Sequence, residues 1–128
     1  MRTLRRNSTA VKQEVERLWR DRETLAVDQA RRWPAEDILA AVVTAHGTTV
    51  EAVRSYARDR ATSLARHHAV WEMRQRRLDM TLRQIADMVH RANHATALNS
   101  VVVFTEHAKR GHYAAERAAV ANALDGEA

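Results

Sequence analysis

The chain has no cysteine, one proline and three glycines among its 128 residues. The absence of cysteine excludes disulfides and thiol chemistry. The scarcity of proline and glycine, with abundant alanine, arginine, leucine, valine and glutamate, is typical of an all-helical protein. The length corresponds to one domain with a core large enough to fold alone.

Two further absences exclude whole classes of protein. No apolar run approaches the roughly 20 residues that a membrane helix needs, and no apolar segment follows the basic N-terminus as in a secretory signal. Because the glycines stand only at positions 47, 111 and 126, the chain contains no P-loop motif G-x-x-x-x-G-K-[ST]. We therefore expect a cytoplasmic protein with no membrane partner and no ATP-binding loop.

The seven histidines suggest a metal site, but their spacing does not support one. His67 and His68 are adjacent, so they point apart on a helix, and an expected turn separates His90 from His94. A zinc site needs three or four convergent ligands. No Ser-His-Asp grouping is visible either. We expect no metal, no cofactor and no catalytic residue, and hence a protein that is not an enzyme.

Positive charge is concentrated in the middle of the chain. Residues 54–91 contain nine arginines and four acidic residues, so this segment carries an excess equal to the whole net charge of +5. A localised excess of cations suggests a polyanionic partner. The alternative is that solvated, arginine-rich helix faces reflect the composition of a GC-rich genome.

A long N-terminal helix is predicted from Ser8 or Thr9 to about Arg32. Its apolar residues form two narrow stripes, Val11, Val15, Leu18 and Leu25, and Trp19, Ala26, Ala30 and Trp33. A helix of this kind must pack on something. We interpret the stripes as packing on the body of the domain. Dimerisation is the alternative, since periodicity does not separate the two.

Three helices are predicted after the break at Trp33-Pro34. The first ends at Gly47, and its buried stripe is Ile38, Leu39, Val42 and Val43. The four residues 48–51 form a capping box for a short second helix, with Val50 and Val53 facing inward. The third runs from about Arg60 to Arg77.

The stretch around residues 81–105 is typical of two helices joined by a tight break. A capping box at 81–84 opens the first, and its apolar spacing indicates an amphipathic helix through Leu82, Ile85, Ala86 and Val89. Residues 90–92 form the break, and Asn93 is a suitable N-cap for the second helix. The predicted inner face of that helix is Leu98, Val101, Val102 and Thr105, and the outer face is Ala95, Thr96, Asn99 and Ser100. A last helix over 113–124 has little to bury.

These blocks resemble the C-terminal DNA-binding domain of DnaA, the bacterial replication initiator. Residues 38–53 are similar to the family's first two helices, and residues 58–66 match the spacing of its basic loop and long-helix arginine. Residues 81–85 resemble the first helix of its helix-turn-helix, and residues 93–96 stand at its Asp-His-Thr-Thr signature. The resemblance extends from about Glu36 to His107.

The chain departs from the family pattern at the turn and in the signature. The family's Gly-Gly-Arg is His90-Arg91-Ala92 here, its Asp is Asn93, and one of its threonines is Ala95. Because Asn both donates and accepts hydrogen bonds, whereas ionised Asp only accepts, the base preference is expected to change. His68 and Glu72 stand where the family's long helix is apolar, and their spacing lets them pair.

The resemblance implies an all-α helix-turn-helix bundle of the DnaA C-terminal or Trp-repressor-like type, with an extra long N-terminal helix. It divides the chain into an N-terminal helix (1–34), a helix-turn-helix domain (35–108) and a C-terminal tail (109–128). It implies double-stranded DNA as the partner, bound without the family's ATPase module. The implied base contacts are Asn93, His94, Ala95, Thr96 and Asn99. The implied backbone or minor-groove contacts are Arg58, Arg60, Arg66, Thr81, Arg83 and Arg91.

Three other interpretations remain open. Asn93 and Thr96 are common helix-start residues, so they can serve as caps without touching a base. The fold can instead be a protein-interaction module whose N-terminal helix binds a replication-initiation protein. A homodimer through residues 9–32 would favour a stand-alone regulator of the Trp-repressor-like type, in replication or in transcription.

Overall fold

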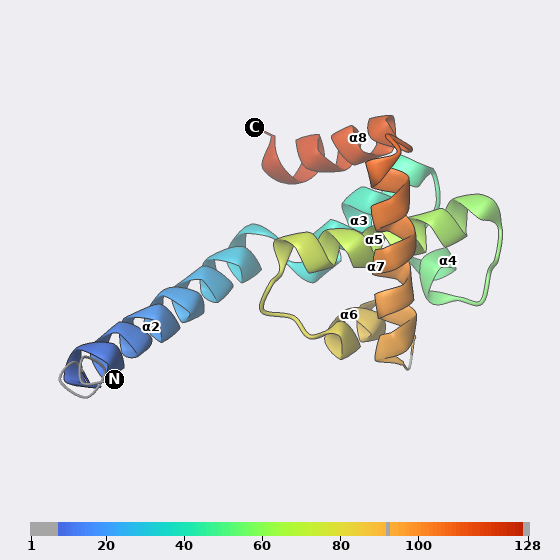
Figure 1. The fold of residues 1–128 in the computed structure, drawn as a ribbon. Helices are drawn as coiled ribbons and strands as arrows, with labels where there is room; N and C mark the ends of the chain where they lie inside the picture. The colour runs from blue at the N-terminus through green and yellow to red at the C-terminus, as the bar shows by residue number, and fades with distance from the viewer. Residues whose placement is uncertain (1–7, 92, 127–128) are drawn as a thin grey trace.

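The computed structural model describes residues 8–91 and 93–126, and all regular structure in these ranges is helical (Figure 1). The helices are α2 (Ser8–Arg32), α3 (Ala35–His46), α4 (Val50–Arg54), α5 (Arg60–Arg76), α6 (Leu82–Met88), α7 (His94–Lys109) and α8 (Ala114–Asp125). The predicted all-α fold class is confirmed. None of the helices described is long and apolar enough to cross a membrane.

Helix α5 is the centre of the bundle, with α3 and α7 packed against it. Helix α6 packs on α7, and α8 packs on α3 (Figure 1). The predicted stripe of α3 is buried as expected, and α3 ends at Gly47, whose φ of 69° lies in the left-handed region. Other fully buried core residues are Val53, Ala65, Ala69, Met73, Ile85, Ala86 and Phe104.

The start of α4 differs by one residue from the prediction. Thr49, and not Thr48, is the N-cap, and its side chain accepts a hydrogen bond from the amide nitrogen of Ala52. The Thr48 hydroxyl instead lies 2.9 Å from that of Thr62 and so links this turn to α5. The competing contact with α5 explains why the box at 48–51 does not form.

The inner face of α7 is only partly the predicted one: Val101 packs against the core as expected, but its neighbours on that face differ. Leu98 and Val102 are 49% and 55% exposed, whereas Ala97, Ser100 and Phe104 are buried. The small side chains at 97 and 100 let α7 approach α5, and the Ser100 hydroxyl lies 2.8 Å from Nδ1 of His67. The inner face of α7 therefore combines the small residues Ala97 and Ser100 with Val101 and Phe104, and Leu98 and Val102 remain at the surface.

Helix α8 buries more than its alanine-rich sequence suggests. Val120 is fully buried and Leu124 packs against the core cluster. Asp125 at the end of α8 accepts hydrogen bonds from Trp33 Nε1 over 2.9 Å and from Arg76 Nη1 over 2.6 Å. The expectation that this helix has little to bury is therefore only partly right: Val120 and Leu124 pack against the core, whereas most of the alanines of α8 are exposed.

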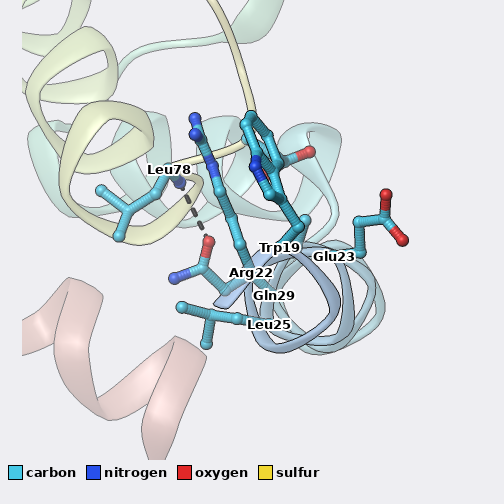
Figure 2. A pocket seen from close by; sticks show the side chains of 8 residues that line it. Trp19, Arg22, Glu23, Leu25, Gln29 and Leu78 are labelled. Carbon is cyan, nitrogen blue, oxygen red and sulfur yellow. Dashed lines mark hydrogen bonds between the residues drawn. The ribbon is translucent and has the colours of Figure 1, made fainter. Parts of the chain in front are cut away.

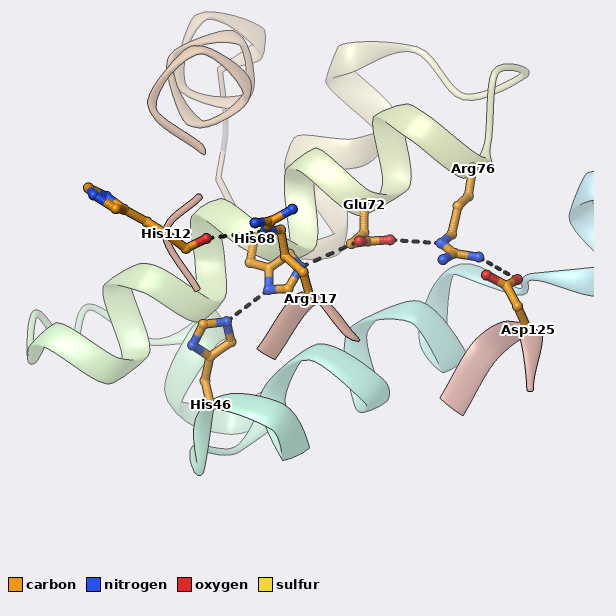
Figure 3. Close-up of polar contacts among 7 residues, drawn as sticks. All are labelled: His46, His68, Glu72, Arg76, His112, Arg117 and Asp125. Carbon is orange, nitrogen blue, oxygen red and sulfur yellow. Dashed lines mark hydrogen bonds and ion pairs between the residues drawn. The ribbon is translucent and has the colours of Figure 1, made fainter. Parts of the chain in front are cut away.

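A chain of polar side chains runs through this part of the bundle (Figure 3). His46 Nε2 lies 2.8 Å from His68 Nδ1, and His68 Nε2 lies 3.4 Å from Glu72 Oε1. Glu72 Oε2 then accepts a hydrogen bond from Arg76 over 2.7 Å. The predicted pairing of His68 with Glu72 is therefore present, and it is buried.

Helix α2 extends away from the bundle (Figure 1). Within residues 9–32 only Gln29 is buried, and its side-chain oxygen accepts a hydrogen bond from the amide nitrogen of Leu78 over 3.0 Å. The prediction that the apolar stripes pack on the body is wrong for Val11, Val15, Leu18, Trp19 and Leu25, which are all exposed. It holds at the C-terminal end of the second stripe, where Trp33 packs against the core. An open groove of about 490 Å³ lies between α2 and the loop after α5 (Figure 2).

Candidate nucleic-acid interface

The helix-turn-helix begins at Thr81, which forms the predicted capping box. Its hydroxyl accepts a hydrogen bond from the Gln84 amide nitrogen, and the Gln84 side chain accepts one from the Thr81 amide nitrogen. Ile85 and Ala86 anchor α6 in the core, while Arg83 is exposed on the other side. The core thus fixes α6, while Thr81, Arg83 and Gln84 at its start are exposed.

The turn between α6 and α7 is closed by His90, whose φ of 54° lies in the left-handed region. This conformation costs a residue with a side chain roughly 1–2 kcal/mol. The amide nitrogen of Arg91 bonds to the Ala86 carbonyl over 2.8 Å and completes the turn. Glycine would adopt this backbone conformation with less strain than His90 does. Ala92, which also belongs to the predicted break, lies outside the described residues.

Asn93 caps α7 as predicted. Its side-chain oxygen accepts a hydrogen bond from the Ala95 amide nitrogen over 2.8 Å. The cap uses the carbonyl oxygen of the side chain, and the amide group of Asn carries two further donors. An Asp at this position could cap equally well but would offer no donor, so the substitution changes what the helix start can offer a base.

The other residues predicted to contact bases lie along the first turns of α7. His94, Ala95, Thr96 and Asn99 are all exposed. The structure therefore brings all five predicted base-reading residues to the same exposed helix start. The role of these residues in base recognition stays a prediction.

The basic loop between α4 and α5 carries Arg58, and Arg60 begins the helix after it. Both are exposed. Arg60 Nη2 lies 3.5 Å from the hydroxyl of Tyr113, the N-cap residue of α8. Asp59 caps α5 by accepting a hydrogen bond from the Thr62 amide nitrogen, which lowers the pKa of its carboxyl. Arg58 is therefore the loop arginine placed to reach a partner.

Arg66 has a structural role that the sequence did not reveal. It is only 9% exposed, and it donates hydrogen bonds to the carbonyl oxygens of Val53, Ser55 and Ala57 at 3.0, 3.4 and 3.1 Å. Burial lowers the pKa of its guanidinium, and the nearby charge of Arg91 lowers it further. These contacts fix the backbone of the loop, while the predicted phosphate contact of Arg66 stays a prediction.

Arg91 joins the turn to the same loop. Its Nη2 donates to the Ser55 carbonyl over 2.9 Å, and its Nη1 lies 3.3 Å from the carbonyls of Val89 and His90. Its guanidinium carbon lies 5.6 Å from the centre of the Tyr56 ring. Sequence reasoning missed Tyr56, although an aromatic residue in a short arginine-rich loop was a visible signal.

Arg54 is a second contact that the sequence did not predict. It donates to the carbonyl of Met88 at the end of α6 over 2.9 Å and pairs with Glu36 over 2.7 Å. It therefore holds the helix-turn-helix against α3 and α4. Within the described residues, no group of three or more His, Cys, Asp or Glu side chains is arranged to hold a metal ion.

The comparison with known families agrees with this geometry. The sequence model for the bacterial DnaA protein helix-turn-helix matches residues 35–102, which span α3 to the middle of α7. No curated protein and no solved structure matches the chain. Because the match covers more than half of the sequence and includes α6, the turn and the first half of α7, the chain belongs to the bacterial DnaA helix-turn-helix family of DNA-binding domains.

Proposed function

We propose that this protein binds double-stranded DNA sequence-specifically, in the control of replication or transcription. One observation carries the proposal. The exposed start of α7 and the exposed arginine loop are joined by the hydrogen bond between Arg91 and Ser55. A polar helix start and a cationic loop held together can engage one duplex at two neighbouring places. In a bacterial cell, this function places the protein in the cytoplasm, at the nucleoid.

Specificity is assigned to the helix start. The major groove displays a distinct pattern of donors and acceptors for each base pair. Asn93 and Asn99 offer amide donors and acceptors, His94 offers ring nitrogens, and Thr96 offers a hydroxyl. The methyl group of Ala95 suits the C5-methyl of thymine. These five residues form the proposed base-reading set.

Affinity is assigned to the arginines and to the start of α6. Arg58 enters the adjacent minor groove, where a narrow groove attracts arginine. Arg60 and Arg83 are exposed and contact phosphates, and Thr81 presents the first turn of α6 to a phosphate oxygen. The main role of Arg66 and Arg91 is to hold the backbone of the loop, and both also add positive charge to the same surface.

Selection from a pool of random duplexes tests the proposal. The wild type is expected to enrich one motif, and His94→Ala is expected to relax the preference at one or two positions of it. Thr24→Ala, an exposed change on α2, is the matched control and should return the wild-type motif. Failure of the wild type to enrich any motif would contradict sequence-specific reading.

A second candidate function is supported by the exposed α2. Val11, Val15, Leu18 and Leu25 follow a heptad spacing, which is typical of a helix that pairs with another helix. In this alternative, α2 binds a replication-initiation protein. A second copy of the chain can use the same helix, and a homodimer would present two recognition helices to a palindromic site.

A further inference from the structure

Tyr56 is the most exposed of the large hydrophobic side chains in the described residues. It is 88% exposed, and it stands in the loop between α4 and α5, two residues before Arg58. An aromatic ring gains free energy when it leaves water, and tyrosine combines an apolar ring with a polar tip that suits an interface. Its position is therefore that of a contact residue, and nothing in the core uses it.

The backbone on both sides of Tyr56 is already fixed. Arg66 donates to the carbonyls of Ser55 and Ala57, and Arg91 donates to the Ser55 carbonyl. The Ala57 amide nitrogen also bonds to the Ser55 hydroxyl over 3.0 Å. Because the loop is ordered before it meets a partner, binding through Tyr56 does not have to supply that ordering free energy.

The surroundings of the ring indicate which partner it suits. The Arg91 guanidinium lies over the ring at 5.6 Å, and the exposed Arg58 follows two residues later. A neutral donor between two cations fits a polyanion better than a protein surface of mixed charge. Insertion of the ring between two base pairs would break its contact with the Arg91 guanidinium, whereas a position against the DNA backbone keeps that contact.

We propose that Tyr56 is a contact to the DNA backbone. Its ring packs against a deoxyribose, and its O–H donates to a phosphate oxygen beside the groove that Arg58 enters. This inference rests on the proposed function and adds a residue to it. Arg91 then acts as a positioning residue, because it holds the ring through the guanidinium contact and through the Ser55 carbonyl.

This assignment has a distinctive signature in solution. Every DNA sequence offers the same phosphate groups, so the loss of a phosphate contact weakens binding to preferred and random duplexes alike. A neutral hydroxyl displaces no counterion, so its loss leaves the slope of log affinity against log salt unchanged, whereas the loss of an arginine contact changes that slope by about one. Reduced affinity with an unchanged slope therefore separates Tyr56 from the arginines.

The experiment compares the wild type with Tyr56→Ala, Tyr56→Phe and the control Leu78→Ala. Leu78 is also exposed but follows the opposite end of α5. Fluorescence anisotropy measures affinity for the selected duplex and for a random duplex at several salt concentrations. We expect Tyr56→Ala to weaken both by about fivefold to twentyfold and Tyr56→Phe by about threefold, for one lost hydrogen bond. Both variants should keep the wild-type salt slope and melting temperature, and Leu78→Ala should match the wild type.

The other outcomes overturn the assignment. Unchanged affinity of Tyr56→Ala, beside a wild type that binds, removes Tyr56 from the interface and leaves the proposed function standing. A loss confined to the selected duplex would show a base contact instead of a backbone contact. A lowered melting temperature with a proportional loss would show a structural role. Absence of wild-type binding to either duplex would overturn the proposed function and this inference together.

Discussion

Arg91 Nη2 donates a hydrogen bond over 2.9 Å to the carbonyl oxygen of Ser55, and this bond joins the turn of the helix-turn-helix to the basic loop. The two residues are 36 positions apart in the sequence. The contact means that the start of α7 and the loop carrying Arg58 are presented to a duplex as one surface. It also connects Arg91, which is displaced from the arginine position of the family, directly to this loop.

We predict that Arg91→Ala loosens the loop. Hydrogen exchange of the amides at 56 and 57 should become faster, because the Ser55 carbonyl loses the shorter of its two hydrogen bonds from arginine and keeps only the one from Arg66. Affinity should fall on selected and random duplexes alike. Arg83→Ala is the matched control, since it removes an exposed arginine without touching the loop. It should lower the salt slope by about one unit and leave the exchange rates unchanged. Equal exchange rates in the two variants would contradict the role of the Arg91–Ser55 hydrogen bond in holding the loop.

Arg66→Ala should destabilise the protein as well as weaken binding. Removing the guanidinium leaves the loop carbonyls without their donor, at a cost of about 1–3 kcal/mol in the free energy of unfolding. Arg58→Ala, at an exposed position in the same loop, should keep the melting temperature and lower the salt slope by about one. Thermal melts and salt titrations distinguish the two. Unchanged stability of Arg66→Ala with a reduced salt slope would contradict the structural role and support the phosphate contact predicted from the sequence.

His94→Ala should reduce specificity more than affinity. Loss of a base-edge contact costs about 1–3 kcal/mol on the preferred site. Binding to random DNA should change little, because phosphate contacts carry it. The melting temperature should stay constant, since His94 is exposed. Asn93→Ala is the comparison, because it also removes the cap and should lower stability by about 0.5–2 kcal/mol. Equal losses on both duplexes for His94→Ala would contradict base readout.

Stability should fall as the pH drops from neutral toward 5.5. Burial lowers the pKa values of His46 and His67 below their ordinary value of 6.5. The unfolded chain therefore binds protons that the folded chain does not, and the free energy of unfolding decreases with acidification below about pH 6.5. Urea denaturation at pH 7.5 and 5.5 measures this effect. The double variant His46→Gln, His67→Gln should show a smaller change than the wild type, while His94→Gln, at an exposed position, should keep the wild-type change.

Self-association through α2 is tested by sedimentation at micromolar concentration. If two copies pair along the exposed stripe, Leu18→Glu should abolish the dimer, because it places a charge in an apolar seam. Arg20→Glu changes the charge by more but lies off the stripe, so it should preserve association. A wild type that remains monomeric, free and on DNA, would leave α2 to a different partner and predict an asymmetric site.

Local rules predicted the parts of the fold in which neighbouring residues decide the outcome. The capping box at Thr81, the cap at Asn93 and the glycine stop at Gly47 depend on contacts within a few residues, and all three are present. The exposed positions of the residues proposed to read bases follow from Asn93, because a cap fixes which residues form the first turn. Arg58 and Arg83, which the family resemblance implied as DNA contacts, are both exposed.

The rules failed where tertiary packing selected between comparable alternatives. Hydropathy favoured Leu98 and Val102 for the inner face of α7, but close approach to α5 required the small residues Ala97 and Ser100. The position of Arg66 in the sequence gave no indication of its bonds to the loop, since those carbonyls lie 9 to 13 residues earlier. An amphipathic pattern likewise does not show which partner covers its apolar face. In α2, the body of the domain does not cover Val11, Val15 and Leu18.

Asp125, at the end of α8, contacts the residues where α2 joins the bundle and so helps to set the direction of α2. Its carboxylate accepts a hydrogen bond from Trp33 Nε1, at the root of that helix and 92 positions away in the sequence, and it lies 3.9 Å from Arg32. The angle at which α2 leaves the bundle is thereby tied to α8. In a two-fold dimer built on α2, that angle sets the distance between the two copies of α7, and hence the number of base pairs that separate the half-sites. In such a dimer, the carboxylate of Asp125 would help to set the number of base pairs between the two half-sites.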